Sequence, residues 1–182
     1  MLKLLYDTAP VAVYYDKAND WLFADWRGTL TLKQVQAGCL TLARCFLKRS
    51  YARVLNSNCD VVSISPEAAP WLAGEFLPHL GLAGIKYLAW VCAPNLLLQH
   101  FANEAVRPLS ATVVVFDDLA GAYAWLQRAH LVSGAVPHEA ARQAEIGWRV
   151  AALAEELAHY EQVARLVATP ARAEAAGKGM LR

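Results

Sequence analysis

The sequence predicts one α/β domain in which an antiparallel hairpin opens a mixed sheet and the later strands run parallel. Two short runs of β-branched and aromatic residues, 11–15 and 21–26, flank a polar segment rich in turn formers, which is the pattern of a hairpin. Farther along, apolar strand-like runs alternate with helical runs, and this alternation is typical of parallel sheets covered by helices. A length of 182 residues suits one such domain with an appendage.

The opening strands carry one unusual charged residue. Residues 2–6 can add an edge strand ahead of the hairpin, and in the run 21–26 both alternating faces are largely apolar. We therefore expect this last strand to be covered on both sides. Asp25 is the exception, and we favour a strand-end residue that pairs with Arg27 or caps the turn over a carboxylate with a perturbed pKa.

A first helix is expected from a cap at Thr29 or Thr31 to about Arg49. Its apolar residues recur at spacings of three or four, the period of one helix face. They are Leu32, Val35, Cys39, Leu42 and Phe46.

A short strand over residues 53–56 and a polar loop follow this helix. Ser65 then has the features of an N-cap, because Pro66 suits the first helical position and Glu67 suits the positively charged first turn. The helix that begins there is expected to reach residue 76 or 80.

The rest of the domain continues the alternation. We expect a strand over residues 85–92, a helix over 94–106, a strand over 111–116 and a helix over 119–130. Either Asp117 or Asp118 can cap the last of these helices. The predicted domain therefore spans residues 1–130.

Beyond the domain, the sequence predicts a linker over residues 131–137, an amphipathic helix over 138–168 and a tail over 169–182. The apolar residues of this helix follow a four-three heptad rhythm. Such a stripe is either a dimer seam or a face packed back on the same domain, and we favour the seam. It comprises Ile146, Val150, Leu153, Leu157 and Tyr160.

Composition limits the classes of partner. A hydrophobic fraction of 57% and a charged fraction of 18% indicate a large buried core. The formal charge is +1 and no large basic cluster occurs, so nucleic-acid binding is not expected. The apolar runs are shorter than the roughly 20 residues that a membrane span needs.

The chain shows no signal-peptide pattern at its N-terminus, so we expect a cytoplasmic protein. The four cysteines form no CxxC pair and are expected to be reduced thiols. Neither the cysteines nor the five histidines fall at ligand spacing, so we predict no metal and no cofactor.

Polar side chains between the third predicted strand and the next helix are candidates for a partner or ligand loop. They lie just past the carboxyl end of a strand, a common ligand position in α/β sheets, although a plain polar loop needs the same residue types. Ser65 is also a candidate phospho-acceptor, with a simple N-cap as the alternative. The loop residues are Asn56, Ser57, Asn58, Asp60, Ser63 and Ser65.

Aromatic residues offer a second candidate site. Trp71, Trp90 and Phe101 could line a pocket for an apolar ligand, or they could simply fill the core.

Three segments carry a resemblance to a known family: residues 24–28 (ADWRG), 53–56 (RVLN) and 115–126 (VFDDLAGAYAWL). Over residues 11–127, the order of elements resembles the STAS fold of bacterial anti-sigma-factor antagonists. The chain is more similar still to their divergent anti-sigma-antagonist-like or lipid-transfer-like relatives. These residues are mostly packing residues, so the resemblance concerns the fold more than the activity.

The resemblance implies a place for partner contact. In members of this family, the loop after the third strand and the start of the next helix meet a partner kinase and receive a phosphate. Ser65 is the positional match, but the Asp before it and the Gly after it in the family motif are absent here.

These observations predict a non-catalytic STAS-like module for signalling or protein interaction that acts as a homodimer. No nucleophile and base can be paired from spacing, so no catalytic residue is assigned. The alternative is a binding protein for a small apolar or lipid-like ligand held between helices and sheet.

Overall fold

The computed structural model describes residues 1–92 and 111–129, together with residues 147, 148, 150–152, 154, 155, 158, 159 and 162. The helix expected over 94–106, the linker and the tail lie outside the described residues. So do most residues of the proposed dimer seam: Ile146, Leu153, Leu157 and Tyr160.

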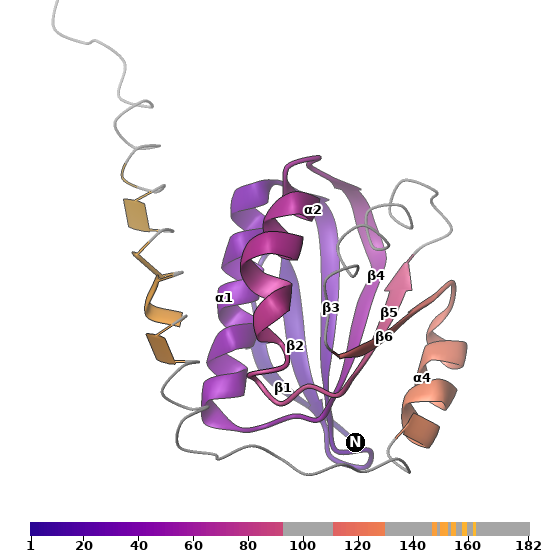
Figure 1. The fold of residues 1–182 in the computed structure, drawn as a ribbon. Coiled ribbons are helices and arrows are strands. Elements are labelled where there is room, and N and C mark those ends of the chain that lie inside the picture. The colour runs from indigo at the N-terminus through magenta and orange to yellow at the C-terminus, as the bar shows by residue number, and fades with distance from the viewer. Residues whose placement is uncertain are drawn as a thin grey trace, which may run out of the picture.

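A six-stranded sheet forms the centre of the fold, with its strands in the order of the chain (Figure 1). Strand β2 runs antiparallel to both of its neighbours, β1 and β3, and β3 to β6 run parallel to one another. The predicted mixed sheet with an opening hairpin is therefore confirmed, as is the edge strand ahead of it. The strands are β1 (Leu2–Asp7), β2 (Val11–Asp16), β3 (Trp21–Leu30), β4 (Arg53–Ile64), β5 (Tyr87–Cys92) and β6 (Thr112–Phe116).

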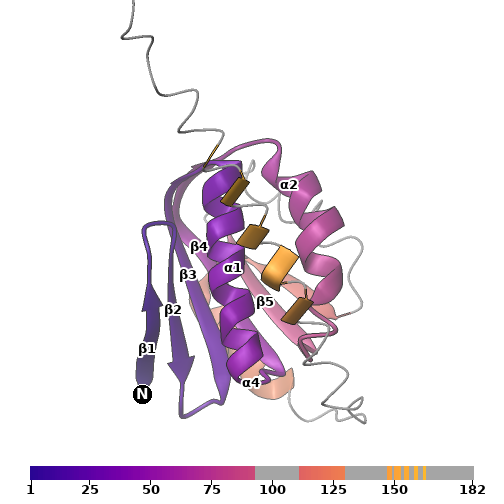
Figure 2. The same cartoon turned by 90° about the vertical axis from the view of Figure 1, so that its left-hand side faces the viewer.

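Helices cover both faces of this sheet. Helix α1 (Leu32–Lys48) and the helical segment of residues 68–79 lie on one face, and α4 (Leu119–Arg128) lies on the other (Figures 1 and 2). Successive side chains of a strand point to opposite faces, so Leu22 and Trp26 join the core under α1 whereas Trp21 joins the core under α4. Strand β3 is thus covered on both sides, as predicted.

Thr31 is the residue that begins α1. Its side chain accepts from the backbone N–H of Gln34, and the Gln34 side chain accepts from the backbone N–H of Thr31, which makes a capping box. Thr29, the other candidate cap, lies within β3. Asp118 plays the same role for α4, because its carboxylate accepts from the backbone N–H of Gly121 at 2.8 Å.

Strand β4 corrects the prediction of a short strand followed by a polar loop. It continues through residues 56–60 and ends at Ile64. Its polar residues stay in the sheet because β3 pairs with it as far as Ile64 and β5 pairs with it as far as Asn58. Both ladders satisfy the backbone groups that a loop would have left to water.

Ser65 is not the N-cap that the sequence predicts. Its backbone N–H donates to the Leu30 carbonyl at 2.8 Å, which extends the link to β3, and its carbonyl accepts from Ala68 N at 3.1 Å. Helix α2 (Ala68–Trp71) therefore begins two residues later than predicted, with Glu67 at the cap position.

Helix α2 continues without a break as a π-helical turn and then a 3-10 turn, and we call residues 68–79 the helical segment. The π-helical turn covers Leu72–Phe76 and the 3-10 turn covers Leu77–His79. Neither turn was predicted, because an apolar pattern does not distinguish these windings from an α-helix.

One described residue of the C-terminal helix, Val150, packs against the domain. Val150 is partly buried and packs against the core under α1, whereas Trp148 is 61% exposed. In the described part of the chain, no helix combines the length and the apolar character that a bilayer crossing requires.

Close packing of α1 on the sheet depends on Gly38. A Cβ atom at this position would collide with the Trp26 ring and would lie 3.3 Å from Val11 Cγ1. The ring cannot easily move aside, because it is buried and its Nε1 donates to Asn56 Oδ1 at 2.8 Å.

We therefore expect Gly38→Ala to destabilise the fold, even though alanine favours a helix by about 1 kcal/mol. Overpacking of this kind lowers the free energy of unfolding by about 1 to 3 kcal/mol, measured by urea denaturation. Gly74→Ala is the matched control, because nothing lies within 4 Å of its Cβ position, and it should be neutral or stabilising. Equal effects of the two substitutions would contradict this account.

Candidate functional site

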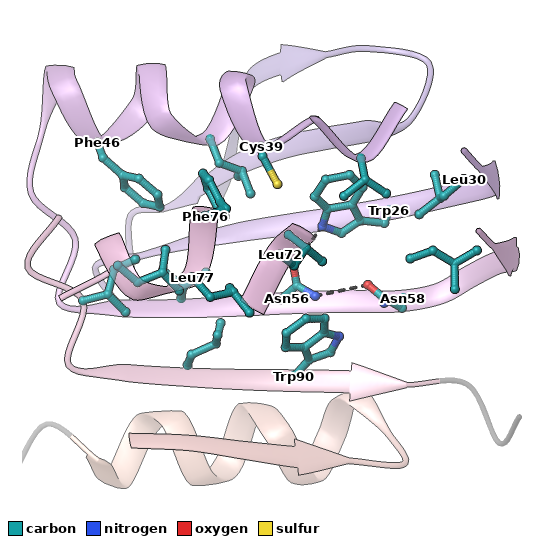
Figure 3. Close-up of a pocket in the computed structure, with 17 residues that line it drawn as sticks. Trp26, Leu30, Cys39, Phe46, Asn56, Asn58, Leu72, Phe76, Leu77 and Trp90 are labelled. Atoms are coloured by element: carbon teal, nitrogen blue, oxygen red, sulfur yellow. Dashed lines mark hydrogen bonds between the residues drawn. The ribbon is translucent and has the colours of Figure 1, made fainter. Parts of the chain in front are cut away.

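An apolar cavity lies between α1, the helical segment and the sheet (Figure 3). Its volume is about 50 Å³. This is room for roughly three to five water-sized spheres at about 10 to 15 Å³ each. The lining residues are Trp26, Leu30, Val35, Cys39, Leu42, Phe46, Val54, Asn56, Asn58, Ile64, Leu72, Phe76, Leu77, Leu80, Ile85, Leu88 and Trp90.

Helix and strand periodicity together bring these residues into one place. The apolar stripe of α1 faces the cavity along one side of the helix, with Val35, Cys39, Leu42 and Phe46 three or four residues apart. On the sheet, alternate residues of the central strands β3, β4 and β5 point the same way. The cavity is thus the incompletely filled part of the core under α1.

Two asparagine side chains and two indoles form a polar group within this apolar lining. Trp26 Nε1 donates to Asn56 Oδ1 at 2.8 Å, and Asn56 Nδ2 lies 3.1 Å from the amide of Asn58 (Figure 3). Asn56 is 8% exposed and Asn58 is 3% exposed, so neither amide can rely on bulk water. Buried polar groups of this kind need partners inside the protein or in a ligand.

The Asn58 amide has a better orientation, reached by a half-turn of its side chain. Its oxygen then accepts from Trp90 Nε1 at 3.2 Å, and its nitrogen donates to the Ser57 carbonyl at 3.2 Å. The other orientation gives it a single bond, from Asn56 Nδ2 to Asn58 Oδ1. Two hydrogen bonds replace one, so we assign the rotated orientation.

The described lining of the cavity carries no charged side chain. Burial raises the pKa of the Cys39 thiol well above its usual value, and burial likewise raises the pKa of Cys92, on β5 beyond Trp90, to about 11. Both thiols are therefore neutral at physiological pH, and a neutral thiol is a poor nucleophile. The cavity is suited to uncharged guests.

The predicted loop residues divide between three places. Asn56 and Asn58 line the cavity, and Ser57 is fully buried on the opposite face of β4. Asp60 and Ser63 are exposed on the last part of β4. The Ser65 hydroxyl oxygen is buried and has no hydrogen-bond partner within the described residues.

The predicted aromatic residues also divide. Trp90 lines the cavity, whereas Trp71 stacks on Phe76 with ring centroids 6.3 Å apart and is not among the lining residues. Phe101 lies outside the described residues. Trp26 was not predicted as a site residue, although a tryptophan in a strand apolar on both faces signals a buried indole N–H that needs a partner.

Asp25 lies on the other face of the sheet, away from the cavity. Burial raises the pKa of its carboxyl, a hydrogen bond from Ser57 lowers that pKa in part, and the nearby charge of Asp60 raises it further. The Arg27 guanidinium donates to Asp7 and to the Thr8 carbonyl instead of pairing with Asp25, and its nearby charge lowers the pKa of Asp25 only in part. Asp25 is thus a carboxylate with a perturbed pKa.

We expect acid to stabilise the wild type relative to Asp25→Asn. Because the folded pKa of Asp25 is raised, its contribution to stability is complete below the unfolded pKa and is lost as the pH rises through the folded pKa. Urea denaturation of both proteins from about pH 7 down to about pH 3 measures this difference. A difference that does not change with pH, or that changes in the opposite direction, would contradict the assignment.

Comparisons with known proteins concern the fold. No protein-family model matches the chain, and no curated protein matches it. Among solved structures, it is similar to an uncharacterised protein of the DUF3478 family from Shewanella loihica PV-4, which has a SpoIIAA-like fold. The two chains are 18% identical, the match covers 68% of this chain and 99% of the other, and the TM-score is 0.45.

Proposed function

We propose that the protein is a non-catalytic binding protein for a small, mostly apolar molecule held between α1, the helical segment and the sheet. The observation that supports this proposal is the cavity itself, whose described lining is apolar apart from two amides. A preformed apolar cavity with a few convergent polar groups is the usual form of a small-molecule site.

The size of the cavity limits the affinity. A guest gains about 25 cal/mol for each Å² of apolar surface that leaves water, and a preformed site avoids much of the entropy lost when a site must order around its ligand. Roughly four buried non-hydrogen atoms at no more than about 1.5 kcal/mol each correspond to a Kd in the tens of micromolar. A longer guest that reaches the cavity mouth can bind more tightly.

The chemistry of the lining favours binding over catalysis. Amides and indoles neither take up nor release a proton near neutral pH, and the Cys39 thiol stays protonated because burial raises its pKa. These groups orient a ligand but supply no general base and no activated nucleophile.

Filling the cavity should abolish binding. Cys39→Leu adds two heavy atoms at a position that is 1% exposed and lines the cavity. With xenon as the probe, which is small enough for this cavity, we expect saturable NMR shifts of the lining methyl groups in the wild type and at least about a tenfold weaker response in the variant.

Cys59→Leu is the matched control, because Cys59 is exposed on β4 and does not line the cavity. It should bind xenon like the wild type. Two results together would overturn the proposal: no saturable shift in the wild type, and a bare mass in native mass spectrometry of freshly purified protein.

A second candidate function is a self-associating interaction module, as the sequence predicts. The supporting observation is the contrast between Val150, which packs against the core of its own domain, and Trp148, which is 61% exposed. We propose that the helix packs its Val150 side on the domain and presents its Trp148 side to a second copy. Large exposed aromatic side chains are enriched in such contacts.

Light scattering across a dilution series tests this second function. We expect a dimer that dissociates on dilution, a lower affinity in Trp148→Glu, and an unchanged affinity in Ala158→Glu, which alters an exposed alanine of the same helix. A chain that stays monomeric at every accessible concentration rules out self-association through this helix. Loss of the dimer in both variants would contradict the assignment to Trp148.

A further inference from the structure

The polar end of the cavity has more donors than acceptors. Each indole of Trp26 and Trp90 brings one N–H group, and each amide of Asn56 and Asn58 brings two. Within this group only the two amide oxygens accept. Asn56 Oδ1 accepts from Trp26 and, in the assigned orientation, Asn58 Oδ1 accepts from Trp90.

The donor that is left without an acceptor in this group is the Asn56 amide nitrogen. In the assigned orientation Asn56 Nδ2 faces Asn58 Nδ2 at 3.1 Å. Both nitrogens are donors, so this contact is no hydrogen bond. Asn58 Nδ2 still donates to the Ser57 carbonyl, which leaves Asn56 Nδ2 as a donor in a side chain that is 8% exposed and lines the cavity.

We infer, building on the proposed function, that the ligand is an apolar molecule with a neutral carbonyl oxygen, which accepts from Asn56 Nδ2 at the polar end of the cavity. A carbonyl oxygen has two lone pairs and can accept from the facing amides of Asn56 and Asn58 without adding a further donor. The rest of the ligand lies among the apolar side chains.

Because the described lining carries no charge, we expect the site to bind a neutral carbonyl compound in preference to a carboxylate. A buried carboxylate needs an opposite charge or several strong donors to offset its loss of hydration. The described lining holds no cation. A neutral ketone, ester or amide matches the site, whereas an ionised acid does not.

The test compares three probes of equal chain length on the full chain by NMR titration. The first is a short-chain methyl ketone, the second is the alkene in which a CH2 group replaces the carbonyl oxygen, and the third is the carboxylate at neutral pH. We expect the ketone to bind about tenfold more tightly than the alkene, because only the ketone satisfies the buried donor. The Asn56 side-chain amide signals should move downfield with the ketone alone.

The outcomes separate this inference from the proposed function. Equal binding of ketone and alkene overturns the inference, since water alone then satisfies the donor, and it leaves the proposed function standing. Tighter binding of the carboxylate than of the ketone also overturns it. If none of the three probes nor xenon binds, the proposed function itself fails.

Two variants locate the effect. Asn56→Leu should remove the preference for the ketone, while Ile64→Val, a small change in the apolar lining, should weaken both neutral probes alike and keep the preference. Should Asn56→Leu fail to fold, the wild-type comparison of the three probes decides the inference without it.

Discussion

The pairing of β4 with a strand on each side is the constraint on which the rest of the structure depends. Residues 56–58 are polar, yet they lie in the centre of the sheet because β3 and β5 take up their backbone hydrogen bonds. Strand geometry then sends Asn56 and Asn58 to one face and Ser57 to the other. A buried amide left without a partner costs about 1 to 3 kcal/mol, so the surrounding side chains must supply partners.

Those partners shape the core under α1. The indole N–H of Trp26 reaches Asn56, and the same ring lies so close to α1 that only a glycine fits at position 38. One hydrogen bond and one close contact thus hold β3, β4 and α1 together. Farther along, the helical segment starts late and winds as a π-helical turn, and the space between it and the sheet is not completely filled.

The described lining of the cavity is uncharged and includes two amides, which supports the proposed binding function. Burial raises the pKa of the Cys39 and Cys92 thiols, so both thiols are neutral and are poor nucleophiles. The perturbed carboxylate, Asp25, faces the opposite side of the sheet. The two proposed functions concern different parts of the chain, since the cavity lies under α1 and the exposed Trp148 lies in the C-terminal helix. The two proposed functions are therefore compatible.

Local sequence determined the hairpin, the parallel alternation, the apolar stripe of α1 and the cap of α4 at one of two aspartates. Each depends on periodicity or on a side chain bonding its own backbone within a few residues. Tertiary structure decided between Thr29 and Thr31, because β3 extends to Leu30, and it decided that residues 56–60 form a strand. Strand pairing is a contact between distant segments, and no local pattern encodes it.

The same reason explains what happened to the candidate site. The sequence indicated Asn56 and Asn58 as part of a polar loop and Trp90 as part of an aromatic pocket, as two separate hypotheses. The structure places all three in one cavity. Ser57, Asp60 and Ser63 do not line that cavity. Residue types were visible in the sequence, but the face on which each one lies depends on the register between strands, which only the folded sheet sets.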